Sequence, residues 1–151
     1  MLKPGDKAPD FTLLSDKNDQ ISLSDFSGKA DVVLYFYPKD NTSSCTKEAC
    51  SFRDNLDVIK MKNATVLGVS PDSVKSHQNF INKHNLNFTL LSDPDHKVAE
   101  AYGAWGEKNM YGKKYWGILR STFIIGKDGI IKHVFKKVKT AVHGEEVLEV
   151  L

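Results

Sequence analysis

The sequence predicts an α/β domain built on a mixed central sheet, and three observations support this prediction. First, segments rich in β-branched and aromatic residues alternate with segments whose apolar residues recur at helical spacing. Second, Asp31–Tyr37 is apolar nearly throughout, as expected of a strand that is buried on both faces. Third, two strand-like segments near the C-terminal end flank Lys127-Asp128-Gly129, which is typical of an antiparallel hairpin. Alternating strands and helices favour a mostly parallel sheet, and the hairpin makes it mixed.

The first half of the chain begins with a hairpin and continues with the central strand. Phe11–Leu14 and Gln20–Leu23 are expected to be short strands around a polar turn. A polar loop after Pro38 leads into a helix from about Cys45 to Met61. The apolar residues of this helix are spaced to share one face: Ala49, Phe52, Leu56 and Ile59. Thr65 to Ser70 is expected to be a second buried strand.

The second half of the chain continues the alternation of helices and strands. The expected elements are a helix over Val74–His84, a strand over Phe88–Leu91, a helix opened by Asp93-Pro94-Asp95 and ended by Gly103, a loop over residues 104–116, strands over Ser121–Ile125 and Ile130–Phe135, and a helix starting near Gly144. Trp105 and Trp116 in the loop are expected to pack rather than to recognise substrate. The whole order matches a thioredoxin fold with an amino-terminal β-hairpin extension.

The composition is that of an ordinary soluble domain. The chain has 151 residues, of which 40% are hydrophobic and 26% charged, and its net charge is +2. No repeat or linker interrupts it, so residues 1–151 are expected to form one domain. The net charge is too small to suggest binding to nucleic acid or to a membrane surface. No apolar run approaches the roughly 20 residues that span a bilayer, and no secretory signal is visible, so a cytoplasmic location is expected.

Two cysteines, Cys45 and Cys50, are the most informative residues of the chain. Two are too few for a disulfide scaffold or for a structural zinc site, and the five histidines show no tight metal spacing. The cysteines are therefore either two buried thiols or a redox pair. Cys45 falls in the first turn of the predicted helix, where free N–H groups and the helix dipole favour a thiolate. Thr42 either places its hydroxyl beside the sulfur or its substrate, or merely caps the helix.

The spacing of the two cysteines limits what they can do. Five residues advance an α-helix by about 7.5 Å and rotate it by about 140°. Cysteines whose Cα atoms lie more than about 7 Å apart cannot form a disulfide without backbone movement. A redox cycle between Cys45 and Cys50 therefore requires the first turns of the helix to unwind. By spacing alone, Cys50 is better explained as an inert thiol on a helix face.

Several segments resemble one enzyme family. Pro38–Cys45 matches the peroxiredoxin pattern P-x-x-x-T-x-x-C, and the longer run through Cys50 resembles the bacterioferritin comigratory protein, or Q-type, branch. Gly5–Phe11, Tyr111–Tyr115 and Arg120–Phe123 are similar to other segments of that branch. The resemblance therefore covers nearly the whole chain.

The resemblance implies an atypical two-cysteine, thioredoxin-dependent peroxidase. Cys45 would attack hydrogen peroxide or an organic hydroperoxide and become a sulfenic acid, and Cys50 would resolve it as an intramolecular disulfide. Thioredoxin or a similar dithiol reductant would then reduce the disulfide. Thr42 would orient the peroxide, Pro38 would shield the thiolate, and Arg120 would stabilise the negative charges. Sulfur supplies the redox chemistry, so no metal or organic cofactor is expected, and the branch implies a monomer.

The sequence departs from the family pattern at one place, and two other functions are compatible with the predicted fold. The family usually has Pro-Gly where this chain has Ser43-Ser44, which puts the loop geometry and the rate in question but not the reaction class. A thioredoxin-fold disulfide reductase or a copper-handling protein would favour C-x-x-C or C-x-x-x-C spacing. A non-catalytic interaction domain could keep the fold. The four-residue gap between the cysteines argues against the first alternative, and the presence of both cysteines with Thr42 and Arg120 argues against the second.

Overall fold

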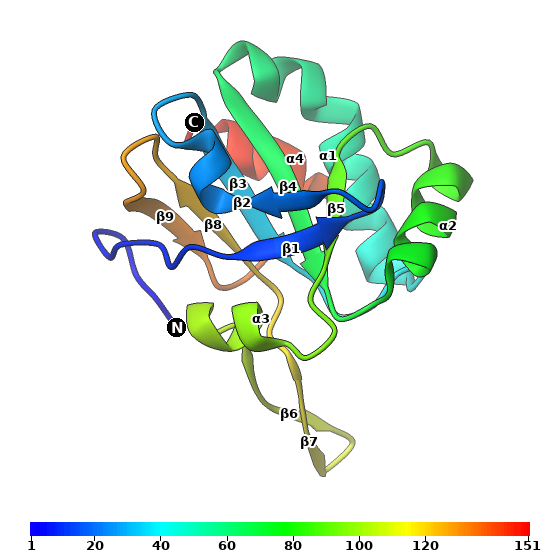
Figure 1. Cartoon of the computed structure of the whole chain (residues 1–151). Coiled ribbons are helices and arrows are strands. Elements are labelled where there is room, and N and C mark those ends of the chain that lie inside the picture. The colour runs from blue at the N-terminus through cyan, green and yellow to red at the C-terminus, as the bar shows by residue number, and fades with distance from the viewer.

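A seven-stranded mixed sheet forms the centre of the computed structural model, which describes all residues from 1 to 151 (Figure 1). The strands lie in the order β2-β1-β5-β4-β3-β8-β9. Their bounds are β1 Thr12–Ser15, β2 Gln20–Ser22, β3 Asp31–Phe36, β4 Ala64–Ser70, β5 Thr89–Ser92, β8 Ser121–Ile125 and β9 Ile131–Phe135. β3, β4 and β5 are parallel, whereas β1 and β8 pair with them in the antiparallel direction.

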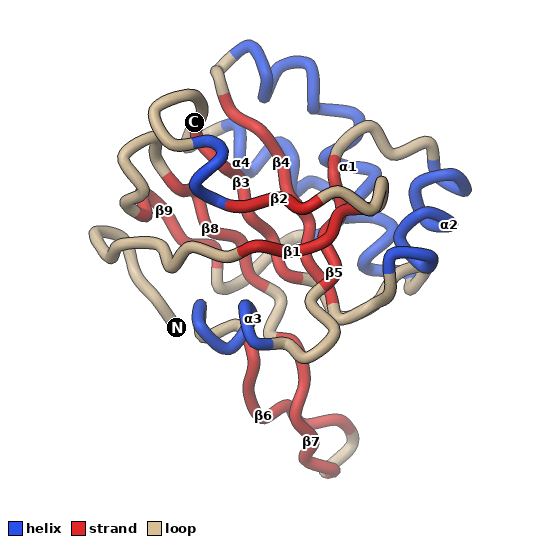
Figure 2. The backbone as a smooth tube through the Cα atoms, viewed as in Figure 1, coloured by secondary structure: helices blue, strands red, loops and turns tan.

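Helices cover both faces of this sheet (Figure 2). α1 (Ser43–Met61), α2 (Val74–His84) and α4 (His143–Leu148) pack on one face, and α3 (Lys97–Tyr102) packs on the other. The 3₁₀ helix η1 (Leu23–Phe26) joins α3 on its face, and η2 (Thr140–Val142) leads into α4. The mixed sheet, the flanking helices and the amino-terminal hairpin confirm the predicted thioredoxin-like arrangement.

Two hydrophobic clusters lie on opposite faces of the sheet, and β3 contributes to both. Because successive side chains of a strand point to opposite faces, alternate residues of β3 enter different clusters. Val32, Leu34 and Phe36 belong to the cluster that also contains Tyr102 of α3. Val33 and Tyr35 belong to the cluster beneath α1, with the four apolar residues predicted for that helix. The two-sided burial predicted for this strand is therefore confirmed.

Residues 104–116, predicted as a loop, instead belong to a β-hairpin. β6 (Trp105–Met110) pairs with β7 (Lys113–Ile118) in the antiparallel direction, and the hairpin projects from the body of the molecule (Figure 1). Its turn places Tyr111 at φ 52° and Gly112 at φ 80°, as a tight hairpin turn requires. Tyrosine seldom adopts a positive φ, so the sequence lacks the usual signal for this turn.

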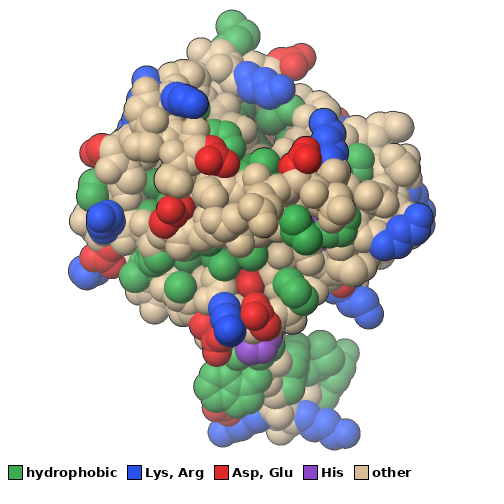
Figure 3. All heavy atoms as spheres, viewed as in Figure 1, with side chains coloured by type: hydrophobic (Ala, Val, Ile, Leu, Met, Phe, Trp, Pro, Cys, Tyr) green, Lys and Arg blue, Asp and Glu red, His purple; other side chains and the backbone are tan.

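The two tryptophans of the hairpin differ from each other. Trp105 stacks on His96 with 3.6 Å between ring centroids, which agrees with the expected packing role. Trp116 is 64% exposed, so the packing predicted for it is wrong. Figure 3 shows hydrophobic side chains gathered on this hairpin, with lysine side chains toward its end. No helix of the structure combines the length and the apolar character needed to cross a bilayer.

Candidate active site

Cys45 lies in the first turn of α1, close to the carboxyl end of β3. Its side chain is 1% exposed and belongs to the hydrophobic cluster beneath α1. The helix begins at Ser43, so Cys45 occupies the predicted place, where the N-terminal end of the helix dipole favours negative charge. Cys45 and Cys50 are both free thiols in this structure.

Arg120 contacts the sulfur of Cys45 directly. Its Nη2 donates a hydrogen bond to Cys45 Sγ over 3.3 Å, and its Nη1 donates to Glu48 Oε1 over 2.6 Å. Arg120 precedes β8, whose first residue Ser121 is paired with Phe36 of β3, so the sheet register brings it to the start of α1. Burial lowers the pKa of Arg120, but the charges of Glu48 and Cys45 outweigh this effect and raise it. The guanidinium is thus a fixed cation that stabilises a thiolate.

Glu48 is a site residue that the sequence reasoning missed. It follows Cys45 by three residues on α1, and its side chain is fully buried. Burial raises its pKa to about 7, although the charge of Arg120 opposes the shift. Its second oxygen, Oε2, has no hydrogen-bond partner. An unpaired polar atom in the interior is unfavourable, and such atoms occur at functional sites more often than elsewhere. Its i, i+3 spacing places it near Cys45 on α1, but nothing in the sequence shows that this glutamate is buried.

Thr42 and Pro38 lie on the loop that joins β3 to α1. Thr42 is the N-cap residue of α1, but its side chain makes no capping hydrogen bond. Its hydroxyl instead donates to the carbonyl oxygen of Lys39 over 2.8 Å, so the interpretation of Thr42 as a mere side-chain cap is wrong. Pro38 is half-buried directly after β3. The structure therefore brings Cys45 and Arg120 into contact, with the other two residues on the adjoining loop.

Cys50 lies one and a half turns farther along α1 and is half-buried. The helix runs without interruption from Ser43 to Met61, so both cysteines lie within one regular element. A rise of about 1.5 Å per residue separates them by about 7.5 Å along the axis. The intact helix therefore keeps the two sulfur atoms apart, as the spacing predicted.

Lys108 is a second cation near this site, and it comes from the β6–β7 hairpin that the sequence did not predict. Burial lowers the pKa of Lys108, and the charge of Arg120 lowers it further, while Cys45 opposes the shift. Its Nζ lies 5.9 Å from the centroid of the Tyr115 ring, to which it is cross-strand paired. β6 thus adds positive charge to the surroundings of Cys45.

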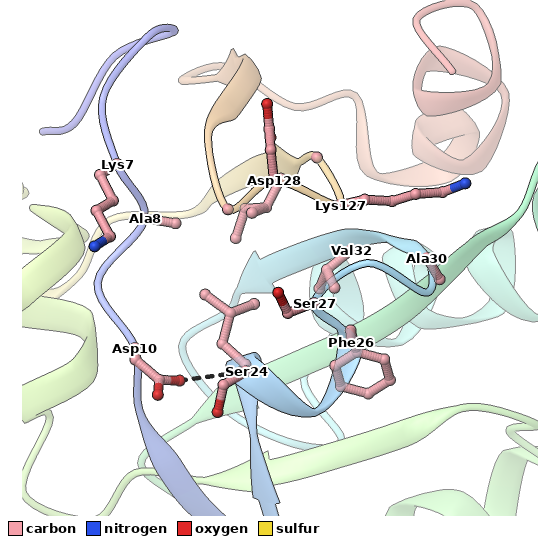
Figure 4. A pocket seen from close by; sticks show the side chains of 14 residues that line it. Lys7, Ala8, Asp10, Ser24, Phe26, Ser27, Ala30, Val32, Lys127 and Asp128 are labelled. Carbon is pink, nitrogen blue, oxygen red and sulfur yellow. Dashed lines mark hydrogen bonds between the residues drawn. The ribbon is translucent and has the colours of Figure 1, made fainter.

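A cavity of about 370 Å³ lies elsewhere in the molecule, between the amino-terminal segment, η1 and the turn from β8 to β9 (Figure 4). Asp10 lines it and accepts a hydrogen bond from the Ser24 amide over 3.1 Å. None of the site residues described above borders this cavity. A peroxide group is small, so the site is identified by the contacts of the sulfur rather than by hollow volume. No three His, Cys, Asp or Glu side chains are grouped so that they could hold a metal ion.

Comparison with known proteins points to the same chemistry. Residues 4–134 match the model of the AhpC/TSA family. The chain belongs to the AhpC/TSA family. It is 52% identical to the putative peroxiredoxin bcp of Coxiella burnetii, with 97% of each chain covered. It is 49% identical to peroxiredoxin Bcp of Bacillus subtilis, over 99% of this chain and 95% of the relative. Within the family the chain is therefore a peroxiredoxin of the Bcp/PrxQ type, and its activity is that of a thiol peroxidase.

Solved structures of family members share the fold. A mutant of Xylella fastidiosa PrxQ superposes with a TM-score of 0.92 at 40% identity, covering 99% of this chain and 94% of that one. The bacterioferritin comigratory protein of Xanthomonas campestris, described for its alkyl peroxide reduction activity, gives a TM-score of 0.86 at 40% identity, covering 92% and 88%. These relatives favour a peroxidase over a disulfide reductase, a copper-handling protein or a non-catalytic domain.

Proposed function

We propose that the chain reduces hydrogen peroxide and alkyl hydroperoxides with Cys45 as the attacking residue. The observation that carries this assignment is the Arg120 guanidinium, which hydrogen-bonds Cys45 Sγ and Glu48 at the same time. A fixed positive charge beside a buried sulfur favours the thiolate, which is the nucleophilic form. The alkyl peroxide reduction named for the Xanthomonas campestris relative supports the inclusion of organic substrates.

The first step oxidises Cys45. Its thiolate attacks one peroxide oxygen, the O–O bond breaks, and the leaving oxygen takes the electron pair and a proton to depart as water or an alcohol. The sulfur is left as a sulfenic acid. Arg120 stabilises the negative charge that develops on the leaving oxygen. Thr42 orients the peroxide through its hydroxyl, and Pro38 shields the thiolate from water.

The second step forms the disulfide. The Cys50 thiolate attacks the sulfenic sulfur, which releases the hydroxyl group as water after it gains a proton, and a Cys45–Cys50 bond results. The intact helix separates the two sulfurs, so the first turns of α1 unwind for this step. A dithiol protein such as thioredoxin then reduces the disulfide by exchange and restores both thiols.

The cellular form of the enzyme is part of the same proposal. Both cysteines of the cycle lie in one chain, so residues 1–151 act as one domain and as a monomer. The cycle depends on free thiols in the resting state, which agrees with a reducing compartment such as the cytoplasm.

Cysteine variants test the proposal. In a steady-state assay with thioredoxin, thioredoxin reductase and a nicotinamide donor, Cys45→Ser is expected to abolish peroxide consumption. Cys50→Ser is expected to retain the first turnover, seen as loss of one thiol per chain, and to lose recycling by thioredoxin. It is the matched control, because it removes a thiol from the same helix. Full activity in Cys45→Ser would show that the assignment is wrong.

A further inference from the structure

Asp40 is a buried acid in the middle of the active-site loop. It lies two residues after Pro38 and two before Thr42, and its side chain is only 2% exposed. The residues on either side of it, Lys39 and Asn41, are exposed. Asp40 is therefore the only residue between Pro38 and Cys45 whose side chain anchors the loop in the interior.

The carboxylate of Asp40 has three hydrogen-bond partners. Tyr37 donates its hydroxyl to Oδ1 over 2.6 Å, and Ser76 donates its hydroxyl to Oδ2 over 2.8 Å. His77 Nδ1 lies 2.7 Å from Oδ2, and the His77 side chain is fully buried. The backbone amide of Asp40 also donates to Asp72 Oδ2 over 2.7 Å. Both ends of the residue are thus tied to the segment around the start of α2.

The two ring nitrogens of His77 connect the active-site loop to the central sheet. Its Nε2 lies 2.9 Å from the carbonyl oxygen of Leu91, which can only accept, so Nε2 carries a hydrogen. The contact between Nδ1 and Asp40 Oδ2 then holds one shared proton, because two bare acceptors would repel each other at 2.7 Å. His77 therefore bridges β5 to the active-site loop, and both of its ring nitrogens are engaged.

The hydrogen bonds of Asp40 lie where they can affect the rates of both steps of the reaction. The loop contains Pro38, which shields the thiolate of Cys45, and Thr42, which orients the peroxide. It also leads into the turns of α1 that unwind. Ser43-Ser44 lack the rigidity of a proline at the end of the loop, so the loop depends on its buried anchor. An interaction present only in the folded form of the loop favours oxidation of Cys45 and opposes unwinding.

We propose that the Asp40–His77 pair is the positioning device that holds the active-site loop in its peroxide-reducing form. Neither residue touches the reacting atoms, and both act through Pro38, Thr42 and the start of α1. Breaking the pair is expected to slow the oxidation of Cys45 and to speed the formation of the Cys45–Cys50 disulfide. The inference rests on the peroxidase function proposed above and adds the residues that set the balance between its two steps.

A pair of variants at one position separates positioning from packing. The amide of asparagine replaces Nδ1 of histidine, so His77→Asn keeps a donor for Asp40 and loses the contact with Leu91. The amide of glutamine replaces Nε2, so His77→Gln keeps the contact with Leu91 and loses Asp40. Asp40→Asn and the double variant Asp40→Asn/His77→Gln complete a double-mutant cycle.

The full-length proteins are mixed with hydrogen peroxide, quenched with a thiol-blocking reagent and analysed by mass spectrometry. This measurement gives the rate of Cys45 oxidation, the rate of disulfide formation and the yield of sulfinic acid in one experiment. His77→Gln and Asp40→Asn are expected to lower the oxidation rate about tenfold, the scale of one lost charged hydrogen bond, and to raise the rate of disulfide formation. His77→Asn is expected to oxidise at nearly the wild-type rate, and the double variant to be no slower than Asp40→Asn.

Two further variants serve as a control for stability and as a milder change at the same carboxylate. Tyr102→Phe removes a buried hydrogen bond to the carbonyl oxygen of Pro9 on the opposite face of the sheet, so it controls for lost stability alone and should leave both rates unchanged. Ser76→Ala removes one of the three donors to Asp40 and should shift both rates in the same directions by a smaller factor. It remains informative if the variants at Asp40 or His77 do not fold.

Three outcomes would overturn the inference: unchanged rates in folded His77→Gln, equal slowing in His77→Asn and His77→Gln, or slowing of both steps together. Failure of the underlying function has a different signature, because the wild type would then show no oxidation that depends on Cys45. If the wild type is active and the variants at Asp40 and His77 keep its rates, the positioning role is rejected while the peroxidase function stands.

Discussion

Arg120 divides one guanidinium between a sulfur and a buried carboxylate. The planar fork of arginine presents several donors in fixed directions, so Nη1 and Nη2 serve Glu48 and Cys45 simultaneously. The single ammonium group of lysine is a point charge that does not reproduce this geometry. The charge at position 120 and its shape are therefore separate contributions to the reactivity of Cys45.

Arg120→Lys separates these contributions. Because the charge remains and the fork is lost, we expect the second-order rate of Cys45 oxidation to fall about a hundredfold, the range seen when one transition-state donor is removed. Stopped-flow measurement of the tryptophan signal with hydrogen peroxide checks this. Arg53→Lys on the same helix is the control, since the guanidinium of Arg53 bonds only to Asp54 and to the carbonyl oxygen of His84. An oxidation rate equal to that of the wild type would contradict the role of the fork.

Glu48 makes the stability of the protein depend on pH. Its pKa is about 7 in the folded protein against an ordinary value of 4.5, so between these values the folded state binds a proton that the unfolded chain has lost. Stability is therefore expected to fall by about 2–3 kcal/mol as the pH rises across this window, an effect absent in Glu48→Gln. Urea unfolding of both proteins at about pH 5 and about pH 8 measures the difference. A constant difference between the two proteins would disprove it.

At the residue level, the sequence predicted the cation that contacts the sulfur of Cys45, but it did not predict Glu48. Cys45, Thr42 and Pro38 could be named because they share one spaced motif, and Arg120 because the segment Arg120–Phe123 resembles the same family. Glu48 could not, because a glutamate in the first turns of a helix usually faces solvent. Its partner in the interior is Arg120, which is 72 positions away along the chain and is brought there by strand pairing.

α1 consists of two parts that are held by different neighbours. From Ser51 onward it is fixed to α4: the Gly144 amide donates to Ser51 Oγ over 2.8 Å, and that hydroxyl donates to Glu145 over 3.2 Å. Arg53 adds a bond to the carbonyl oxygen of His84 over 2.7 Å. From Ser43 to Cys50, the side chains of the helix form hydrogen bonds only with Arg120. The helix is therefore expected to unwind up to Cys50 and to stay intact beyond it.

Hydrogen exchange tests this boundary. In the oxidised protein, the amides of residues 46–54, which donate to the carbonyl oxygens of residues 42–50, are expected to lose protection, while those from Asn55 onward keep it because the contacts with α4 persist. Ser51→Ala should move the boundary toward the C-terminal end. Gly144→Ala should do the same, since its added methyl group would lie 2.6 Å from the carbonyl oxygen of Ser51. Loss of protection throughout α1 in the oxidised wild type would contradict the two-part description.

At the element level, the segments with long and clearly bounded patterns were predicted most accurately. β3 and α2 were predicted within one residue of their observed ends, because their patterns are long and their flanking residues stop them. The β6–β7 hairpin was missed because it extends into solvent. Its strands have no buried face with alternating apolar residues, and its three glycines are typical of loops.

The whole molecule separates its active site from half of its core. The cluster beneath α1 contains Cys45, whereas the cluster on the other face of the sheet contains none of the proposed site residues. The mixed sheet and its helices could be predicted from the order of elements. The two clusters arise because successive side chains of each strand point to opposite faces of the sheet. Which face lies beside Arg120 depends on the register between β3 and β8, which the sequence does not show.

Two leucines allow the clusters to be compared. Leu67 lies in the cluster away from the site and Leu56 in the cluster beneath α1, and each is 2% exposed. Leu67→Ala and Leu56→Ala are each expected to lower the free energy of unfolding by about 2–5 kcal/mol. Only Leu56→Ala should also speed disulfide formation, because it loosens the anchored part of α1. Urea unfolding and the quenched-flow assay measure the two effects, and faster disulfide formation in Leu67→Ala would argue against separate roles.

The unpaired Oε2 of Glu48 also bears on the reduction potential of the cysteine pair. In the dithiol form this carboxyl group is buried, and the unwinding proposed for the first turns of α1 would return it to water. On this proposal the desolvation penalty falls on the reduced protein alone, so it would stabilise the disulfide relative to the dithiol and make the reduction potential more negative. Each 1.4 kcal/mol of this penalty corresponds to about 30 mV. A carboxyl group that is buried in the reduced enzyme would thus make it easier for a peroxide to oxidise the cysteine pair and harder for the reductant to restore it.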